Sequence, residues 1–396
     1  MPKPPFFKRI GLLGYIVIAI IAGLGLGFIL PGWTVRIFVT INTLFSEFLG
    51  FVIPFLILSL VAPAIIEIGR GAGKMLVFTV VLAYVATILS GLLAYGTGSL
   101  LFPSVIQPGT VISEAAASDA LQPFFTLEIE PVMTVTTSLV LAFVLGLCVS
   151  RLSSTALRDV LFDCRDVIIM VIRGVIVPFL PFYIFGIFLD MTYSGEAGSV
   201  LGTFIKVIGI IFVLHVVLLV AQYLIGGWID GKNPLHCLKL ILPAYFTALG
   251  TASSAATIPV TLKQTKLMGI DPAVADFTVP LCATIHLSGS TLKIVSCALA
   301  LMILKGMPYD FPLFMNFIMM LAITMVAAPG VPGGAVMAAL GVLSSILGFT
   351  DADNALIIAL YITMDSFGTA CNVSGDGALT LIVDRFFGNR KSVAVN

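Results

Sequence analysis

The stretch "GTASSAATIP" (250–259) divides the apolar region 234–267 into two short arms. The stretch "PGVPGG" (329–334) divides the region 311–349 in the same way. Each arm is shorter than the roughly 20 residues that cross a bilayer as a helix, and Gly and Pro interrupt a continuous helix. Because exposed backbone cannot face lipid, each interruption must lie inside the protein or beside a water-filled cavity. Both regions therefore predict re-entrant helical hairpins.

The rest of the chain has the composition of membrane-spanning helices. Hydrophobic residues make up 59% of the sequence and charged residues 10%, far from the shares found in soluble domains. We expect about eight spans of roughly 20 residues each. They lie near residues 10–30, 43–66, 75–102, 132–152, 166–192, 200–228, 273–305 and 350–385. The predicted fold is an all-α polytopic membrane protein with eight transmembrane helices and two re-entrant hairpins. The order hairpin, span, hairpin, span predicts inverted repeats, and such paired interruptions indicate a transporter's binding site.

Positive charges indicate the orientation of the chain. Lys and Arg gather at both termini and in the connections that follow even-numbered spans, whereas the acidic connection 103–131 contains neither. Cytoplasmic loops are rich in Lys and Arg, so we expect a multi-pass protein of the cytoplasmic (inner) membrane with both termini in the cytoplasm. The net charge of zero argues against a nucleic-acid partner. No enzyme signature, organic cofactor motif or paired-cysteine site is present in the sequence.

The last predicted span carries a polar face. Within "DSFGTACNVSGD" (365–376), Asp365, Thr369, Asn372 and Asp376 are four, three and four residues apart and share one side of a helix. Acids inside a membrane segment indicate function by default. The alternative is a polar face satisfied by neighbouring helices. Helix N-termini at the two hairpin tips would suit an anion such as a substrate carboxylate.

Four motifs occur along the chain in a fixed order: "SSAATIPVT" (253–261), "ATIHLSGST" (283–291), "PGVPGG" (329–334) and "DSFGTACNVSGD" (365–376). Together they resemble the glutamate transporter homologues, also called the dicarboxylate/amino acid:cation symporters. The resemblance covers essentially the whole chain. It implies a homotrimer of elevator-type secondary transporters embedded in the lipid bilayer.

The resemblance also implies a division into two domains. Residues 1–74 and 132–192 would form a static scaffold. Residues 75–102 and 200–396, with the hairpins at 234–267 and 311–349, would form a transport domain that slides across the bilayer. The second hairpin would be the gate.

The implied substrate site consists of Ser253, Ser254, Ser290, Val331, Gly333, Asp365, Gly368, Thr369 and Asn372. Asp365 would hold the substrate ammonium, needing no protein cation as partner, and Asn372 would donate to the α-carboxylate. Gly368 stands where carriers of acidic substrates place an arginine, and the other position used for it is Ala252 here. A desolvated acidic side chain would lack a bidentate partner, so a small neutral amino acid is expected, with open space beside Gly368.

Two alternatives to a carrier of neutral amino acids stay open. The first is an acidic amino acid or dicarboxylate, which would find its cation in Lys293 or in protonated His286. For Lys293 itself, a salt bridge elsewhere is favoured over this role. The second alternative is an anion channel lined by the two polar spans near the C-terminus.

The coupling ion is expected to be sodium or a proton. By resemblance, the metal ligands would come from Asp376, Asn372, Thr284, Tyr84 and Thr87. Three ligands of relatives are replaced here, by His286 for an asparagine, Ser288 for an aspartate and Ser290 for a threonine. Sodium prefers several oxygen ligands, so fewer sodium sites are expected. His286 would either carry a coupled proton beside Asp376 or stay neutral and structural.

Overall fold

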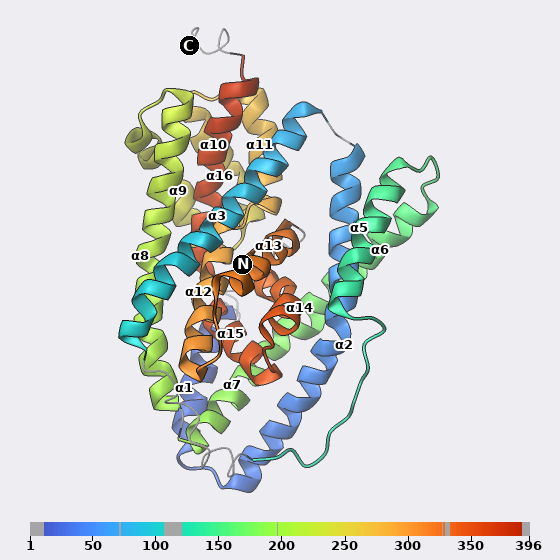
Figure 1. The fold of residues 1–396 in the computed structure, drawn as a ribbon, viewed down its shortest axis with the longest axis vertical. Helices are drawn as coiled ribbons and strands as arrows, with labels where there is room; N and C mark the ends of the chain where they lie inside the picture. The colour runs from blue at the N-terminus through green and yellow to red at the C-terminus, as the bar shows by residue number, and fades with distance from the viewer. Residues whose placement is uncertain are drawn as a thin grey trace, which may run out of the picture.

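The computed structural model describes residues 12–70, 73–106, 121–195, 197–326, 328 and 333–389 (Figure 1). Within these ranges the chain forms helices and connecting turns, and no strand. The all-helical class that the sequence predicts is therefore confirmed. Most of the tip of the second predicted hairpin, including Val331, lies outside the described residues.

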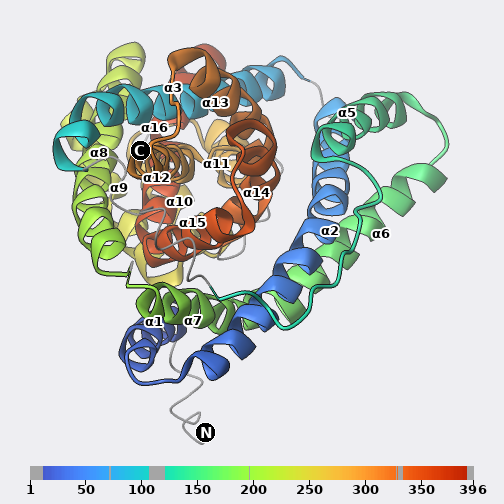
Figure 2. The same cartoon turned by 60° about the horizontal axis from the view of Figure 1, so that its bottom comes forward.

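A first group of helices forms a curved wall along one side of the molecule (Figure 2). It contains α1 (Leu12–Gly27), α2 (Gly32–Arg70), α5 (Val135–Arg151), α6 (Ala156–Val171), the π-helical turn η2 (Ile172–Ile176) and α7 (Val177–Tyr193). The helix α2 packs on α5, and α1 packs on α7. Glycines allow the second contact, since a Cβ at Gly23 would lie 2.8 Å from the Phe185 carbonyl oxygen of α7.

A second group of helices gathers into a bundle beside this wall (Figure 2). It contains α3 (Lys74–Val105), α8 (Ala197–Asp230), α9 (Pro234–Thr251), α10 (Ser254–Leu267), α11 (Pro272–Ile285), α12 (Ser288–Lys305), α13 (Phe311–Val326), α14 (Gly334–Leu347), α15 (Asp351–Thr363) and α16 (Asp365–Phe387). The helix α12 contacts α3, α8 and α16, and Ser288–Leu304 are buried on every side. A helix enclosed all round needs no polar face, which explains its apolar sequence.

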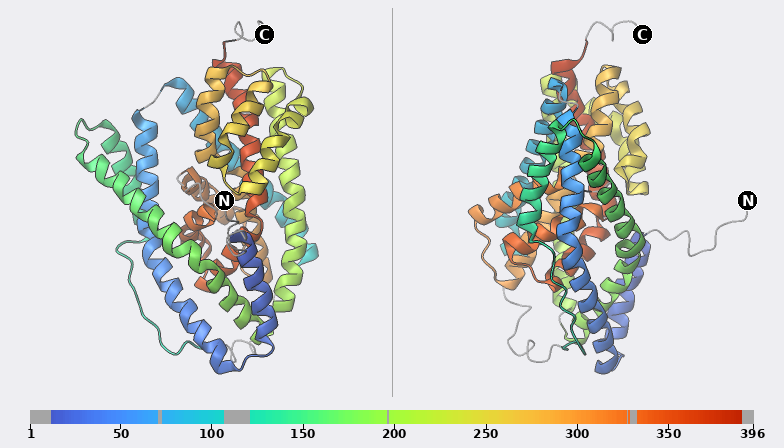
Figure 3. Two further views of the ribbon diagram at one scale, coloured as in Figure 1. Left: turned by 180° about the vertical axis from the view of Figure 1, so that it is seen from behind. Right: turned by 90° about the vertical axis from the view of Figure 1, so that its right-hand side faces the viewer.

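Both predicted hairpins are pairs of packed helices, α9 with α10 and α13 with α14. The first turns at Ala252, which has a left-handed φ of 48°, and Ser253 then caps α10 by accepting the Ala256 N–H. Ala252 is the one non-glycine residue with positive φ within the described part of the chain. Figures 1 and 3 show α9 and α10 at the end where the C-terminus emerges, and α13 and α14 toward the opposite end. Whether the hairpins re-enter a membrane stays a prediction.

Several described helices are apolar enough to cross a membrane. Five pass on length and composition, and a sixth passes if α15 and α16, which meet at 65°, count as one span. The helices α1 and α5 are apolar but shorter, at 16 and 17 residues. The multi-pass helical class is supported, while the total of about eight spans stays a prediction.

The spans predicted near 273–305 and 350–385 are not single continuous helices. The first breaks at His286 and Leu287, between α11 and α12, and the second breaks at Met364, between α15 and α16. Each break leaves backbone N–H and C=O groups without intrahelical partners. These groups lie where the two hairpins approach the bundle centre, and this is where the site is built.

Candidate functional site

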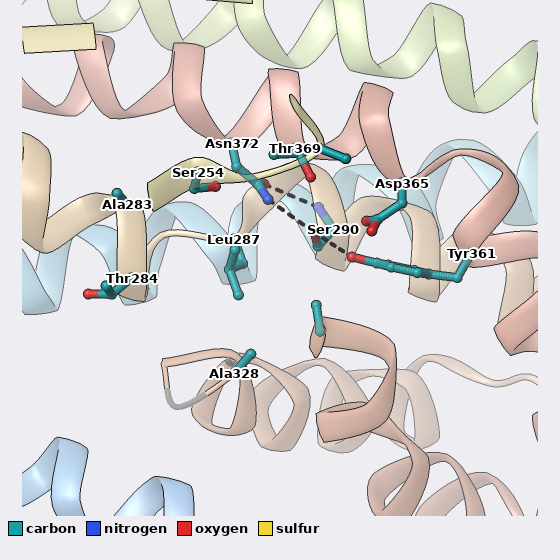
Figure 4. Close-up of a pocket in the computed structure, with 12 residues that line it drawn as sticks. Ser254, Ala283, Thr284, Leu287, Ser290, Ala328, Tyr361, Asp365, Thr369 and Asn372 are labelled. Atoms are coloured by element: carbon teal, nitrogen blue, oxygen red, sulfur yellow. Dashed lines mark hydrogen bonds between the residues drawn. The ribbon is translucent and has the colours of Figure 1, made fainter. Parts of the chain in front are cut away.

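A small cavity lies where both hairpins meet α12 and α16 (Figure 4). Ala252 and Ser254 of the first hairpin line one side, and Ala328 and Ala335 of the second line the other. Its volume is about 30 Å³, and a water needs about 10–15 Å³. The cavity therefore holds about two or three waters and is too small for an amino acid.

Asn372 connects α16 to the broken start of α12. Its Oδ1 accepts the backbone N–H groups of Gly289 and Ser290, at 2.8 and 3.2 Å. Its Nδ2 donates to Ser290 Oγ at 3.0 Å, and the Tyr361 hydroxyl donates to the same Oγ at 2.9 Å (Figure 4). The side chain thus satisfies the N–H groups that the break at Leu287 leaves free.

Asp365 pairs with a lysine from another helix. Lys293 Nζ lies 3.4 Å from Asp365 Oδ1 and 3.3 Å from the Met364 carbonyl oxygen. The same ammonium sits 3.6 Å from the centre of the Tyr361 ring, within reach of a cation–π interaction. The expectation that Asp365 needs no protein cation is therefore wrong, because α12 and α16 pack side by side.

Gly368 makes room for this lysine. A Cβ at this position would overlap Lys293 Cε and lie 2.5 Å from Nζ. The expectation of open space for a substrate side chain beside Gly368 is wrong for the same reason. The volume beside Gly368 is thus filled by the Lys293 side chain, which comes from α12.

A second buried acid on α16 pairs with the histidine that the sequence singled out. His286 Nδ1 lies 2.9 Å from Asp376 Oδ1, and both side chains are at most 1% exposed. The other ring nitrogen lies 3.4 Å from Gln222 Nε2, which donates to Ser288 Oγ at 3.2 Å. Sequence reasoning missed Gln222, whose signal was a polar side chain in the mostly apolar region 200–228.

Some predicted site residues line the cavity, and others lie beside it or on α3. Described members that line the cavity are Ser254, Thr284, Ser290, Asp365, Thr369 and Asn372. Gly333, at the start of α14, donates its N–H to Asp365 Oδ2 at 2.9 Å. Tyr84 and Thr87 lie on α3, where their hydroxyls donate to the carbonyl oxygens of Met319 and Ala83. Neither contributes to the cavity lining, and the ligand roles of both stay predictions.

The chain matches known proteins over nearly its full length. The model of the sodium:dicarboxylate symporter family matches residues 12–386. A serine/threonine transporter SstT from Acinetobacter baumannii is 28% identical over 398 residues, covering 96% of this chain and 98% of that protein. A serine/threonine transporter SstT from Streptococcus suis is 28% identical over 355 residues, with coverage of 84% and 94%. One from Acinetobacter baylyi is 25% identical over 399 residues.

Proposed function

The chain belongs to the sodium:dicarboxylate symporter family, and we propose that it carries small neutral amino acids across the cell membrane as a secondary active transporter. The family match confirms the resemblance that the four motifs indicate. It makes the protein a membrane transporter and not an enzyme. The relatives named serine/threonine transporters make serine and threonine the first candidates as substrates.

The observation that carries this proposal is the set of side chains around the cavity. Among the described residues that line it, none is Lys or Arg, while Ser254, Ser290 and Thr369 offer hydroxyl groups. A carboxylate on the substrate side chain would be desolvated there without a bidentate partner, which disfavours acidic amino acids. A short neutral or hydroxylated side chain meets no such cost.

The substrate's two charged groups are assigned to different groups of the cavity lining. Ser254 begins α10, and Ala335 lies one residue after the start of α14, so two helix N-termini face the cavity. Helix N-termini attract anions, and we assign the α-carboxylate to these two N-termini. We assign the ammonium to Asp365, as the resemblance implies.

We propose that the second hairpin opens to admit the substrate. The cavity of about 30 Å³ cannot hold an amino acid, so an element that lines it has to move. The Gly333 N–H bond to Asp365 Oδ2 is one contact that this opening would break. An elevator motion of the α3, α8–α16 bundle against the α1, α2, α5–α7 wall, in a homotrimer, follows from the resemblance. It is supported by the separate packing of the two groups (Figure 2).

We propose sodium as the first coupling ion, bound near Asp376 at a reduced number of sites. The family name supports sodium, and Ser288 in place of an aspartate supports the reduction. A second candidate is the proton, favoured by the 2.9 Å contact between His286 and Asp376. We place both termini in the cytoplasm from the distribution of Lys and Arg.

Uptake into proteoliposomes tests this function. Purified protein would be supplied with labelled serine under an inward sodium gradient, an inward proton gradient, or no gradient. We expect concentrative serine uptake with the sodium gradient, inhibited by excess threonine or alanine and not by aspartate. Strong inhibition by aspartate without inhibition by threonine would instead support the acidic-substrate alternative. Ion currents without saturable serine uptake would support a channel.

A further inference from the structure

Lys293 is a fully buried lysine surrounded by groups that attract a cation. Its side chain is fully buried, and it approaches Asp365 from α12 without lining the cavity. A buried ammonium is costly unless it is paired and hydrogen-bonded. Here a carboxylate, a backbone carbonyl and an aromatic face surround it, from Asp365, Met364 and Tyr361. All three neighbours favour the charged form of the lysine.

The surrounding helices hold the lysine in place. The Met364 carbonyl lies at the junction of α15 and α16, where it accepts the N–H groups of Phe367 and Gly368 as well as the lysine ammonium. Gly368 leaves the volume that the end of the lysine side chain fills. The position thus depends on a helix break and on a glycine, both within the last predicted span.

Both oxygens of Asp365 already have partners within the protein. Oδ1 faces Lys293, and Oδ2 accepts the Gly333 N–H. The carboxylate is therefore charge-balanced before any substrate binds. A substrate ammonium would come to a carboxylate that holds one cation already, and the two positive groups would repel each other. A neutral hydroxyl could donate to Oδ2 without that repulsion.

We propose that Lys293 acts as a tethered counter-cation, which lets this cavity accept small 2-hydroxy carboxylates in addition to amino acids. The inference rests on the proposed transport function, because it assumes that the substrate binds in the same cavity. A 2-hydroxy acid presents the carboxylate of an amino acid with a hydroxyl group in place of its ammonium. Without Lys293, such a ligand would enclose two carboxylates and no cation between them, which is strongly unfavourable. With Lys293, the substrate hydroxyl donates to Asp365 and the substrate carboxylate faces the N-termini of α10 and α14.

In this account Lys293 is a positioning residue that acts through Asp365. Its removal should therefore affect two ligands in opposite directions. A hydroxy acid loses the cation that makes its charge tolerable. An amino acid brings its own ammonium, which then becomes the sole cation at Asp365.

Equilibrium binding of two matched ligands to the full-length protein in lipid nanodiscs tests this inference. The ligands are labelled L-serine and labelled L-glycerate, which differ only in ammonium against hydroxyl at the 2-position. We expect the wild-type protein to bind both. In Lys293→Met, we expect glycerate binding to weaken at least tenfold, while serine binding stays equal or becomes tighter.

Two further variants complete the design. Lys305→Met is the matched control, because Lys305 ends the same helix. Its Nζ lies 2.8 Å from Asp353 Oδ1, and neither residue lines the cavity. It should leave the ratio of the two affinities unchanged. The double variant Lys293→Met with Asp365→Asn removes both charges, so it serves if the single variant does not fold. It should retain glycerate binding and lose serine binding.

The outcomes separate this inference from the transport proposal. Serine binding without glycerate binding in the wild-type protein overturns the inference and leaves the transport proposal intact. Glycerate binding without serine binding in the wild-type protein overturns the transport proposal. The inference then stands if Lys293→Met abolishes glycerate binding. Equal losses for both ligands in Lys293→Met, with the double variant equally impaired, would show a purely structural lysine and overturn the inference.

Discussion

The helix α16 carries two buried acids, Asp365 and Asp376, whose partners differ in kind. Asp365 faces Lys293 at 3.4 Å, and Asp376 faces His286 at 2.9 Å. Both partners come from the chain around the α11–α12 break. The first partner is an ammonium on a long flexible side chain, and the second is an imidazole ring with two nitrogens. The two acids on one helix are thus held by different chemistry, an ammonium that also contacts an aromatic ring and an imidazole that also contacts an amide.

The largest expected effect comes from breaking the lysine pair. Asp365→Asn leaves the Lys293 ammonium buried without its carboxylate, and removing one member of a buried pair costs about 3–5 kcal/mol. We expect a lower unfolding temperature and no serine uptake, measured by thermal unfolding in detergent and by proteoliposome assays. Asp276→Asn is the control, since Asp276 forms an exposed ion pair with Lys266. An Asp365→Asn variant as stable as the wild type would contradict the pairing.

The next effect concerns the glycine that accommodates the lysine. Gly368→Ala places a methyl group against Lys293, and overpacking of this kind costs about 1–3 kcal/mol. We expect reduced thermal stability together with a changed ratio of serine to glycerate binding. Gly209→Ala is the matched control, because a Cβ at Gly209 in α8 meets nothing within 4 Å. Equal stability of the two alanine variants would show that Lys293 leaves the volume beside Gly368 free.

A third test addresses the histidine pair. His286→Asn keeps a donor that reaches toward Asp376 and removes the group that titrates. If His286 carries a coupled proton, wild-type uptake varies between about pH 5 and 8 and the variant's does not. We expect a flattened pH profile and a steeper dependence on sodium, both from initial uptake rates. The exposed His236→Asn variant should keep the wild-type profile. An unchanged profile in His286→Asn would assign His286 a structural role.

The smallest effect is expected at an acid outside the site. Asp271 precedes α11, and N–H bonds from Asn389 and Ala273 lower the pKa of its carboxyl group. A lowered pKa in the folded state means that this stabilisation is present above the ordinary pKa and is lost as pH falls through the lowered value. Asp271→Asn should therefore cost about 0.3–1 kcal/mol near neutral pH and nothing in strong acid. Thermal unfolding at pH 7 and at about pH 1 checks this, and equal losses at both would contradict it.

Much of the fold follows from local sequence signals. Gly and Pro around residues 250–259 and 329–334 predicted the two helical pairs, because these residues interrupt helices wherever they occur. The breaks at Leu287 and Met364 were not predicted. Neither residue is a helix breaker, and each break is stabilised by contacts from other helices, such as Asn372 with the N–H groups of Gly289 and Ser290.

The sequence predicted most residues of the candidate site, but it did not predict that Lys293 pairs with Asp365. The spacing of Asp365, Thr369, Asn372 and Asp376 predicted a shared polar face, and His286 was correctly expected beside Asp376. The pairing of Lys293 with Asp365 spans 72 positions and depends on how α12 packs against α16. From the sequence, a glycine at position 368 indicates space for a neighbouring group, but only the structure shows that Lys293 fills that space.

The central claim, a carrier of small neutral amino acids, is tested most directly by one ratio. Initial uptake of labelled serine and of labelled aspartate would be measured in parallel, in proteoliposomes with an inward sodium gradient. The cavity lining described here predicts sodium-dependent serine uptake at least tenfold above that of aspartate. Sodium-dependent aspartate uptake equal to or above that of serine would contradict the account.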